Sequence, residues 1–264
     1  MNAPITITEV LGRAKQGMTR PFICRSDDGA TCFVKGAYAG RRSLCCEWVA
    51  NRLVRPMLPE AVLGVPPFRM AEVPPALIKG SVMPDIRDLG AGRVFASMLV
   101  KDGLELEWSE AQAWPEETKA LLLLLDLWLQ NEDRSLSALG GNPNLLVTPG
   151  RALEASGGSD PPRGERLWAY DFNLAFDPDF SRARFFDAHV FGSMLRQWPA
   201  GFRESMTARL ETALTEVRTI FAELPLEWLH LDGDESLPVQ LDVEGVNSIL
   251  QLPFTESDSF WTLP

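Results

Sequence analysis

Histidine is scarce in this chain, which has only His189 and His230 among its 264 residues. Two histidines are too few for a metal centre built on imidazole ligands, and His189 lies in an aromatic-rich segment where we expect it to be packed rather than catalytic. The sequence also lacks the GxSxG, HExxH and Walker A patterns. These absences argue against a nucleophile-elbow hydrolase, a zinc metalloprotease and a P-loop nucleotidase.

Cysteine is equally sparse, and all of it lies in the first fifth of the chain. Cys24, Cys32, Cys45 and Cys46 lack the paired spacing of a zinc site and occur in apolar runs. We therefore expect buried free thiols, as in a protein of a reducing cytoplasm.

Long hydrophobic runs are missing too. The longest, Leu121–Leu125, resumes after Asp126 but stays well short of the roughly 20 residues that span a bilayer. Residues 1–10 lack the charged and apolar regions of a signal peptide. We expect a cytoplasmic protein without membrane association.

Positive charge is in deficit, because 25 Lys and Arg residues against 36 Asp and Glu residues give a net charge of −11. Phosphate contacts need a basic surface, so we expect no direct nucleic-acid binding, although a local basic site for a nucleotide is compatible with this charge. A hydrophobic content of 45% is ordinary for a globular protein, and the length allows one domain or two lobes.

Residues 1–101 are predicted to form mostly strands with one inserted helix. The expected strands are short apolar runs bounded by turn residues: Phe22–Arg25, Thr31–Lys35, Phe68–Val73, Leu77–Lys79 and Val94–Val100. A hairpin turn at residues 26–29 joins the first two. A helix capped by Ser43 is predicted to run to about Val54. Residues 5–15 are weakly patterned, and we assign no element to them.

Residues 102–264 are predicted to be mainly helical. Pro115 followed by two glutamates is a good helix start, and the leucines that follow imply burial on nearly all sides of that helix. Further helices are expected at about Arg184–Arg196 and Phe202–Glu223. The acidic tail from 231 to 264 is predicted only to be a helical or irregular cover on the core.

The middle of the chain contains three polar residues in an informative order. Leu145–Thr148 and Leu167–Tyr170 are predicted to pair as an antiparallel hairpin. Asn144, before the first strand, then lies beside Asp171, which follows the second, because neighbouring strands run about 4.8 Å apart. Both offer the oxygen ligands that Mg²⁺ prefers. Asp133, at the end of the preceding helix, can stand near that metal without binding it.

These three residues are those that phosphoryl transfer needs: a carboxylate that orients the attacking hydroxyl, and an Asn and an Asp that hold the metal on the nucleotide. A structural interpretation stands beside this one, because Asp and Asn are common turn formers. Each residue alone is more often structural, and only their order and spacing favour catalysis. Likewise, Lys35 at a strand end is commonplace, and Glu47 lies off the apolar stripe of its helix, where a solvated glutamate is the ordinary expectation.

Five short motifs occur in a consistent order between about residues 17 and 176. They are VKG at Val34–Gly36, Glu47–Ala50 leading to Gly64–Pro66, QNEDR at Gln130–Arg134, NPNLL at Asn142–Leu146 and YDFNLAF at Tyr170–Phe176. In these motifs the chain resembles the HipA-like kinases, a bacterial branch of the protein-kinase-like fold. The resemblance implies an α+β, bilobal fold with a strand-rich N-lobe (1–101), a helical C-lobe (102–264) and an ATP·Mg²⁺ cleft near residue 102.

The resemblance also implies a role for each matching residue. Lys35 would neutralise the nucleotide phosphates, with Glu47 as its ion-pair partner. Asp133 would accept or orient the proton of the substrate hydroxyl. Asn144 and Asp171 would hold Mg²⁺.

Further nucleotide contacts follow from the same resemblance. The run Met98–Val100 would be the hinge that offers backbone groups to adenine, so Val100 is predicted to contact the cofactor. Residues 17–20 occupy the position of a phosphate-covering loop, in which Thr19 is the candidate for an autophosphorylated hydroxyl. Asp133 and Asn144 are further apart than in other kinases, so residues 135–141 must loop out as an insertion.

The resemblance, together with these residues, implies an ATP- and Mg²⁺-dependent serine/threonine kinase that phosphorylates a protein, with the chain itself as one candidate substrate. Two alternatives remain open. The absence of an Ala-Pro-Glu activation motif fits a small-molecule or lipid-headgroup kinase as well. A pseudokinase that acts as a binding module would explain the insertion as a decayed metal site. An antitoxin-like partner is left open, with nothing in the sequence to support it.

Overall fold

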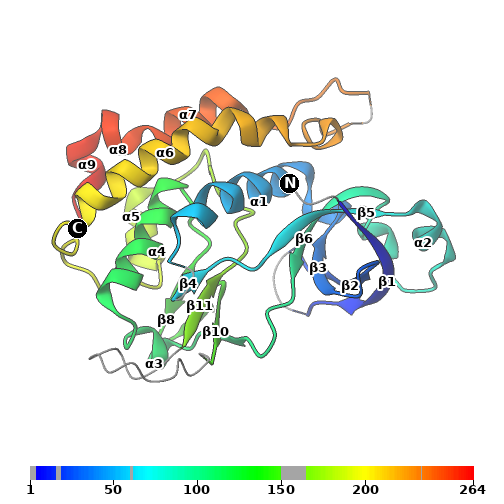
Figure 1. Cartoon of the computed structure of the whole chain (residues 1–264), viewed down its shortest axis with the longest axis horizontal. Helices are drawn as coiled ribbons and strands as arrows, with labels where there is room; N and C mark the ends of the chain where they lie inside the picture. The colour runs from blue at the N-terminus through cyan, green and yellow to red at the C-terminus, as the bar shows by residue number, and fades with distance from the viewer. Residues whose placement is uncertain (1–3, 16–18, 60–61, 150–164, 233) are drawn as a thin grey trace. The chain divides into compact units, whose positions relative to one another are not determined.

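The computed structural model describes residues 4–15, 19–59, 62–149, 165–232 and 234–264 (Figure 1). Helices and strands are mixed along this part of the chain, which is consistent with the predicted α+β class. Backbone contacts divide the chain into two units. Unit 1 comprises residues 1–48, 66–101 and 224–240, and unit 2 comprises residues 49–65, 102–223 and 241–264.

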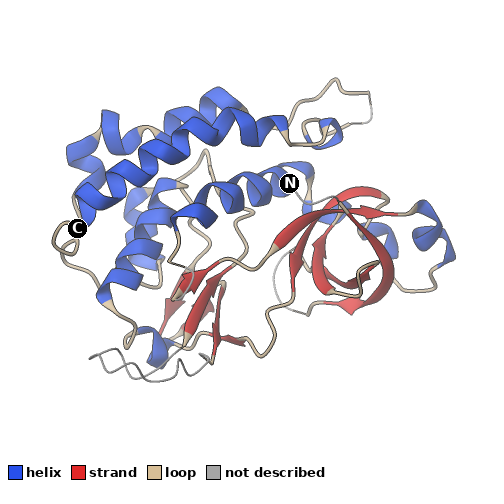
Figure 2. Ribbon diagram, viewed as in Figure 1, coloured by secondary structure: helices blue, strands red, loops and turns tan. Residues whose placement is uncertain are grey.

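Unit 1 is built on a closed barrel with the strand order β1-β2-β3-β6-β5. Its strands are β1 (Ile5–Arg13), β2 (Phe22–Ser26), β3 (Thr31–Lys35), β5 (Phe68–Val73) and β6 (Gly92–Met98). Neighbouring strands are antiparallel except β1 and β5, which pair in parallel at Ile5 and Ala71. This parallel pair closes the ring of strands that is visible in Figure 2.

Alternating side chains explain these strands. The β2–β3 hairpin was predicted and is confirmed, with Phe22 opposite Val34 and Arg25 opposite Thr31. Strand β1 was not predicted, although Ile5 and Ile7 alternate with threonines and are both buried. A period of two over such a short stretch was the available signal for a half-buried strand.

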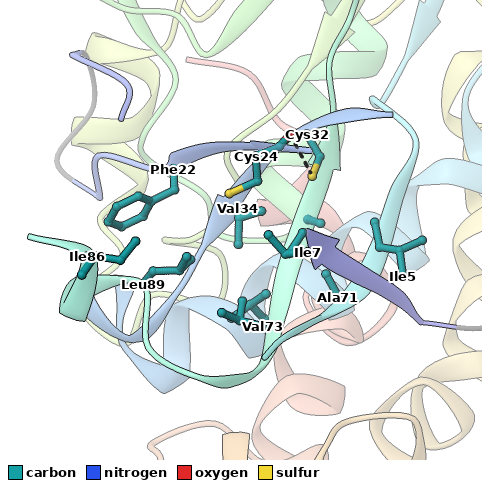
Figure 3. Packing of buried hydrophobic residues seen from close by; sticks show 12 residues of the cluster. Ile5, Ile7, Phe22, Cys24, Cys32, Val34, Ala71, Val73, Ile86 and Leu89 are labelled. Atoms are coloured by element: carbon teal, nitrogen blue, oxygen red, sulfur yellow. Dashed lines mark hydrogen bonds between the residues drawn. The ribbon is translucent and has the colours of Figure 1, made fainter. Parts of the chain in front are cut away.

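Apolar side chains from every strand fill the barrel (Figure 3). Cys24 and Cys32 lie directly opposite each other on β2 and β3, and both are fully buried. Burial raises the pKa of the Cys24 thiol to about 12 and that of Cys32 to about 11. All four cysteines are free and buried, as predicted.

The helical segments of unit 1 are short. They are η1 (Ala37–Ala39), α2 (Pro75–Gly80), η3 (Ile86–Asp88) and η4 (Leu226–Trp228), together with the first part of α1 (Arg41–Val54). The prediction of an extended run at Leu77–Lys79 was wrong, because Pro75 stands at the first helical position, where its fixed φ favours a helix. Helix α1 begins at Arg41 rather than after Ser43, since the carbonyl of Gly40 accepts from Leu44 and starts the first turn.

Unit 2 combines a four-stranded sheet, in the order β4-β11-β10-β7, with a separate β8–β9 hairpin. These strands are β4 (Leu63–Gly64), β7 (Leu104–Glu105), β8 (Ser135–Ser137), β9 (Gly140–Asn142), β10 (Leu145–Thr148) and β11 (Arg166–Ala169). The predicted hairpin of β10 and β11 is confirmed, with Leu145 opposite Ala169. Residues 150–164, between the two strands in the sequence, lie outside the described residues.

Helices make up most of the rest of unit 2. They are the end of α1, η2 (Arg55–Met57), α3 (Trp108–Ala111), α4 (Glu116–Trp128), α5 (Arg182–Ala188), α6 (Phe202–Ala222), α7 (Val243–Leu250), α8 (Leu252–Thr255) and α9 (Ser257–Trp261). The tail therefore forms short helices, and α7 packs along α6 (Figure 1). No described helix combines the length and apolarity that crossing a membrane requires.

Two helices of unit 2 differ in how well the sequence predicted them. Helix α4 is buried from Thr118 to Trp128, as the run of leucines predicts. Helix α5 ends at Ala188, eight residues before the predicted end at Arg196, because His189 adopts an extended backbone (φ −61°, ψ 135°). Its side chain is held by contacts from distant parts of the chain, which no local pattern reveals.

Candidate functional site

The first group of candidate residues lies in unit 1, where Lys35 ends β3 and Glu47 lies on α1. The Lys35 Nζ and Glu47 Oε1 atoms form an ion pair, and the two residues are only 7% and 1% exposed. The expectation of a solvated Glu47 is therefore wrong, whereas the ion pair implied by the resemblance is present. Removing one partner of such a buried pair typically costs about 3–5 kcal/mol, because the other charge is left uncompensated.

Gly36 lets the backbone after Lys35 pass close to another segment. A Cβ at this position would lie 2.0 Å from the carbonyl oxygen of Leu89. The next residue, Ala37, donates its N–H to the same carbonyl at 3.0 Å. The close approach fixes the path of the chain beyond Lys35. It leaves no room for a side chain, which explains why the VKG motif has glycine at this position.

Thr19 and Val100, the other predicted nucleotide contacts, also belong to unit 1. The Thr19 hydroxyl is buried and has no hydrogen-bond partner among the described residues, while Gly17 and Met18 of the predicted phosphate-covering loop lie outside them. Val100 follows β6 and is partly buried. In the predicted hinge, Met98 and Leu99 donate their N–H groups to the carbonyls of Pro67 and Thr31. The roles of Thr19 and Val100 stay predictions.

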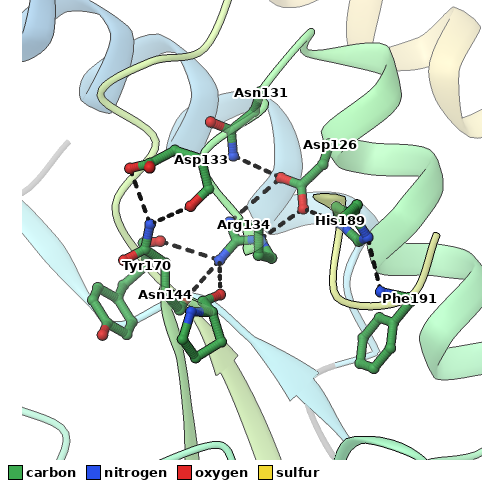
Figure 4. A network of polar contacts seen from close by, with 9 residues as sticks. Asp126, Asn131, Asp133, Arg134, Asn144, Tyr170, His189 and Phe191 are labelled. Atoms are coloured by element: carbon green, nitrogen blue, oxygen red, sulfur yellow. Dashed lines mark hydrogen bonds and ion pairs between the residues drawn. The ribbon is translucent and has the colours of Figure 1, made fainter. Parts of the chain in front are cut away.

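The second group lies in unit 2 and is organised by Asp126, in the last turn of α4 (Figure 4). This carboxylate is fully buried and accepts from three side chains. Arg134 Nε donates to its Oδ2 at 2.6 Å, His189 Nε2 lies 3.0 Å from the same oxygen, and Asn131 Nδ2 donates to Oδ1 at 2.9 Å. The loop after α4 is thereby folded back onto the helix that precedes it.

The protonation states in this network follow from its contacts. Burial opposes the charged form of Asp126, but the charge of Arg134 and the hydrogen bond from His189 outweigh it and hold the pKa of Asp126 below its usual value. Burial lowers the pKa of His189, against the opposing influence of Asp126. His189 Nδ1 accepts from the Phe191 N–H at 3.1 Å, so the neutral ring carries its proton on Nε2 and donates it to Asp126.

Arg134 connects this network to the β10–β11 hairpin. Its Nη1 donates to the carbonyl oxygens of Asn144 at 2.5 Å, Pro143 at 3.3 Å and Tyr170 at 3.3 Å. Asn144 directly precedes β10 and Tyr170 directly follows β11, so both lie at the same end of the antiparallel hairpin. The guanidinium therefore contacts both strands at the end where Asn144 and Asp171 lie.

Asp133 and Asn144 are in direct contact. The Asn144 amide nitrogen donates to the backbone carbonyl of Asp133 at 2.7 Å and to its Oδ2 at 3.1 Å. Across the hairpin, the Tyr170 N–H donates to the Asn144 carbonyl at 3.1 Å, and Asp171 is the next residue. The structure thus brings Asp133 and Asn144 together. Asp171 directly follows Tyr170, whose N–H binds the Asn144 carbonyl.

Several residues around this end of the hairpin have positive φ angles without being glycine. They are Gln130 (51°), Asn144 (49°), Asp171 (60°) and Phe176 (59°). Left-handed backbone is disfavoured for side chains other than glycine, although Asn and Asp tolerate it best. Such conformations persist only where the surroundings enforce them, and they concentrate at functional sites.

The insertion between Asp133 and Asn144 is itself ordered. Residues 135–142 form the β8–β9 hairpin, in which Ser135 pairs with Asn142. Gly141 has a φ of 154°, and a Cβ there would lie 2.4 Å from the Ser135 carbonyl oxygen. The hairpin closes on itself, so the extra residues return Asn144 to the side of Asp133.

The donor atoms at this site fit Mg²⁺. The Asn144 nitrogen is used by Asp133, so the amide oxygen of Asn144 is directed away from that contact, and Asp171 offers a carboxylate. Among the described residues, no three His, Cys, Asp or Glu side chains group as a metal centre. Mg²⁺ does not require such a group, because it is commonly held by one or two protein oxygens together with water and substrate phosphates.

Sequence reasoning missed Asp126, Arg134 and His189 as part of this site. One signal was available, since Asp126 interrupts a helix that is otherwise leucine over two turns. A carboxylate in a helix buried on all sides requires a buried partner. The sequence alone did not identify the partners, because Arg134 lies in the loop that follows the helix and His189 lies 63 positions after Asp126 in the chain.

A comparison with models of protein families identifies the family of this chain. The family model described as HipA-like kinase matches residues 7–264, which is nearly the whole chain. No curated protein matches.

Proposed function

Because the chain belongs to the HipA-like kinase family, which supports a phosphotransferase activity, we propose that it is an ATP- and Mg²⁺-dependent kinase acting on Ser or Thr hydroxyls of a protein. The observation that carries the proposal is the contact between Asp133 and Asn144 next to the end of the β10–β11 hairpin. Units 1 and 2 would correspond to the N-lobe and C-lobe of a kinase-like fold.

Each candidate residue has a defined task in this proposal. Asp133 is partly exposed, and its carboxylate would orient the substrate hydroxyl and take its proton. Asn144 and Asp171 would hold Mg²⁺, which when bound neutralises charge on the nucleotide phosphates. Lys35, fixed by Glu47, would bind those phosphates, and Val100 would offer its backbone to adenine.

The ordered insertion supports catalysis over the pseudokinase alternative. A decayed metal site would leave Asn144 with no reason to stay beside Asp133. Instead, the β8–β9 hairpin absorbs the additional residues, and both hydrogen bonds from Asn144 to Asp133 are made. Nucleotide binding without any ADP formation would reverse this preference.

The acceptor hydroxyl is the least constrained part of the proposal. A screen for ADP release with protein, small-molecule and lipid-headgroup acceptors separates a protein kinase from the alternative kinases. Thr19 is the candidate for autophosphorylation, and its buried hydroxyl would have to leave its present surroundings to accept a phosphate.

The decisive experiment replaces Asp133 by Asn. The variant retains an oxygen that can accept from Asn144, so we expect the fold and ATP binding to be preserved. Phosphoryl transfer from radiolabelled ATP should fall by about 10²–10⁴-fold, which is the usual contribution of a general base. Asp187→Asn, an exposed aspartate on α5, is the matched control and should label like wild type. Equal labelling of Asp133→Asn and wild type would refute the role of Asp133.

A further inference from the structure

The guanidinium of Arg134 is fully buried and uses its two sides for different partners. One side faces the carboxylate of Asp126, through Nε at 2.6 Å and Nη2 at 3.4 Å. The other side presents Nη1 to backbone carbonyls of the hairpin. Its Cζ lies 5.1 Å from the ring centroid of Phe172, a cation–π contact that further restrains the side chain.

The carbonyls that Nη1 contacts belong to, or adjoin, the candidate metal ligands. The backbone carbonyl of Asn144 accepts from Nη1 at 2.5 Å, and the side chain of the same residue is one of the two candidate metal ligands. Tyr170 accepts at 3.3 Å and directly precedes Asp171, the other ligand. A donor shared between the two strand ends limits how far they can separate. Arg134 also directly follows Asp133, so a single side chain restrains the base and both ligands.

We propose that Arg134 is a positioning residue that sets the spacing of Asn144 and Asp171, so that both can hold one divalent cation. The inference rests on the proposed function for the identity of the metal ligands. It adds a residue that touches neither nucleotide nor substrate. Asp126 acts one step further away, because its carboxylate orients the guanidinium.

The shape of the side chain matters here, beyond its charge. A guanidinium donates in a rigid planar fork, whereas a lysine ammonium is a compact charge on a flexible stem. Lysine at position 134 could pair with Asp126 or reach the carbonyls, but it could not hold both in fixed geometry. Arg134→Lys therefore keeps the buried charge balanced with Asp126 and removes the restraint on the hairpin.

The test measures cation binding directly, with Mn²⁺ as an electron paramagnetic resonance probe in the presence of ADP. Loss of a residue that supports a metal ligand typically weakens metal binding by about 10–100-fold. We expect Arg134→Lys to weaken Mn²⁺ binding by about that factor and to raise the Mg²⁺ concentration at half-maximal activity in parallel. Binding of ADP in the presence of EDTA should stay within about twofold of wild type, which a general loss of structure would not allow.

Arg182 on α5 provides a matched control in the same unit. Its Nη2 also donates to two carbonyls, those of Phe260 at 3.1 Å and Thr262 at 2.5 Å, and its Cζ lies 4.9 Å from the ring centroid of Phe186. Arg182→Lys should therefore lose carbonyl and ring contacts like those lost in Arg134→Lys, but it should leave Mn²⁺ binding unchanged. An equal loss of Mn²⁺ affinity in both variants would overturn the proposal.

A second variant covers the case in which Arg134→Lys does not fold. The double replacement Asp126→Asn and Arg134→Gln removes both buried charges together, so neither is left unpaired. It should show the same weakened Mn²⁺ binding, and wild-type Mn²⁺ affinity in either folded variant would overturn the proposal. If neither folds, the structure of the wild-type chain with ADP and Mn²⁺ decides, because a cation held without Asn144 or Asp171 would overturn it.

The outcomes also separate this inference from the proposed function. Wild type that binds Mn²⁺ in an Asp171-dependent manner but transfers no phosphate would refute the kinase activity and leave the positioning role supported. Wild type that binds no Mn²⁺ with nucleotide would overturn both.

Discussion

Acid should destabilise this protein through His189 before its carboxylates are protonated. His189 is fully enclosed, with Asp126 and Arg134 as the charged groups facing it. Its Nε2 proton is donated to Asp126, and its Nδ1 accepts from the Phe191 N–H. Adding a second proton would break the contact with Phe191 and bury a further charge, which is why burial lowers the pKa of His189.

The sign of the effect follows from linkage. A histidine whose pKa is lower in the folded state binds its proton more readily when the chain is unfolded, so stability is lost as the pH falls below the unfolded pKa of about 6.5. The free energy of unfolding therefore decreases by at most about 1.4 kcal/mol between about pH 7.5 and pH 5.5, and this limit is reached when the native ring takes up no proton. The corresponding limit by about pH 4.5 is about 2.7 kcal/mol. Asp126, whose pKa is also lowered, adds its own loss only in stronger acid.

Urea unfolding followed by tryptophan fluorescence at stepped pH measures this directly. In His189→Gln, the amide can still donate to Asp126 but does not titrate, so the loss of stability between pH 7.5 and pH 5.5 should shrink by up to about 1.4 kcal/mol relative to wild type. His230→Gln controls for the removal of a histidine as such. Parallel stability curves for wild type and His189→Gln would show that His189 is not the group responsible and would refute the reasoning.

Two further variants test unit 1 and the insertion. Glu47→Gln removes the negative charge of Glu47 from its buried ion pair with Lys35, so urea unfolding should show a loss of about 3–5 kcal/mol. An ATP titration should show weaker binding, and unchanged stability would contradict the buried ion pair. Gly141→Ala forces a Cβ against the Ser135 carbonyl and should cost about 1–3 kcal/mol and lower phosphoryl transfer, whereas Gly80→Ala, which meets no atom within 4 Å, should change neither.

The elements that local patterns predicted are those whose determinants lie close together in the chain. The β2–β3 hairpin has a strong turn between two apolar runs, and α4 has a proline-led start before its leucines. The end of helix α5 was predicted wrongly, because the helix stops where the side chain of His189 binds Asp126, 63 positions earlier in the chain. A contact at that distance in sequence overrides helical propensity and cannot be seen in a window of one helix.

The candidate site divides in the same way. Asp133, Asn144 and Asp171 were found because phosphoryl transfer requires those residue types in that order. Glu47 was expected in solvent on local grounds, and only the resemblance paired it with Lys35. Chemistry therefore identified the residues that would touch ligand. Asp126 and His189, which hold the loop in place, were not identified, because their contact joins positions 63 residues apart in the chain.

The insertion shows why spacing along the chain is a weaker guide than closure in space. Asn144 follows Asp133 by more positions than in other kinases, which on sequence alone suggested a decayed metal site. A hairpin, however, returns the chain close to its point of departure whatever its length, because its two strands run side by side. Ser135 and Asn142 pair at the open end of β8–β9, and Asn144 meets Asp133 just beyond. The hairpin thus brings the side chain of Asn144 to Asp133 although 11 positions separate the two residues along the chain.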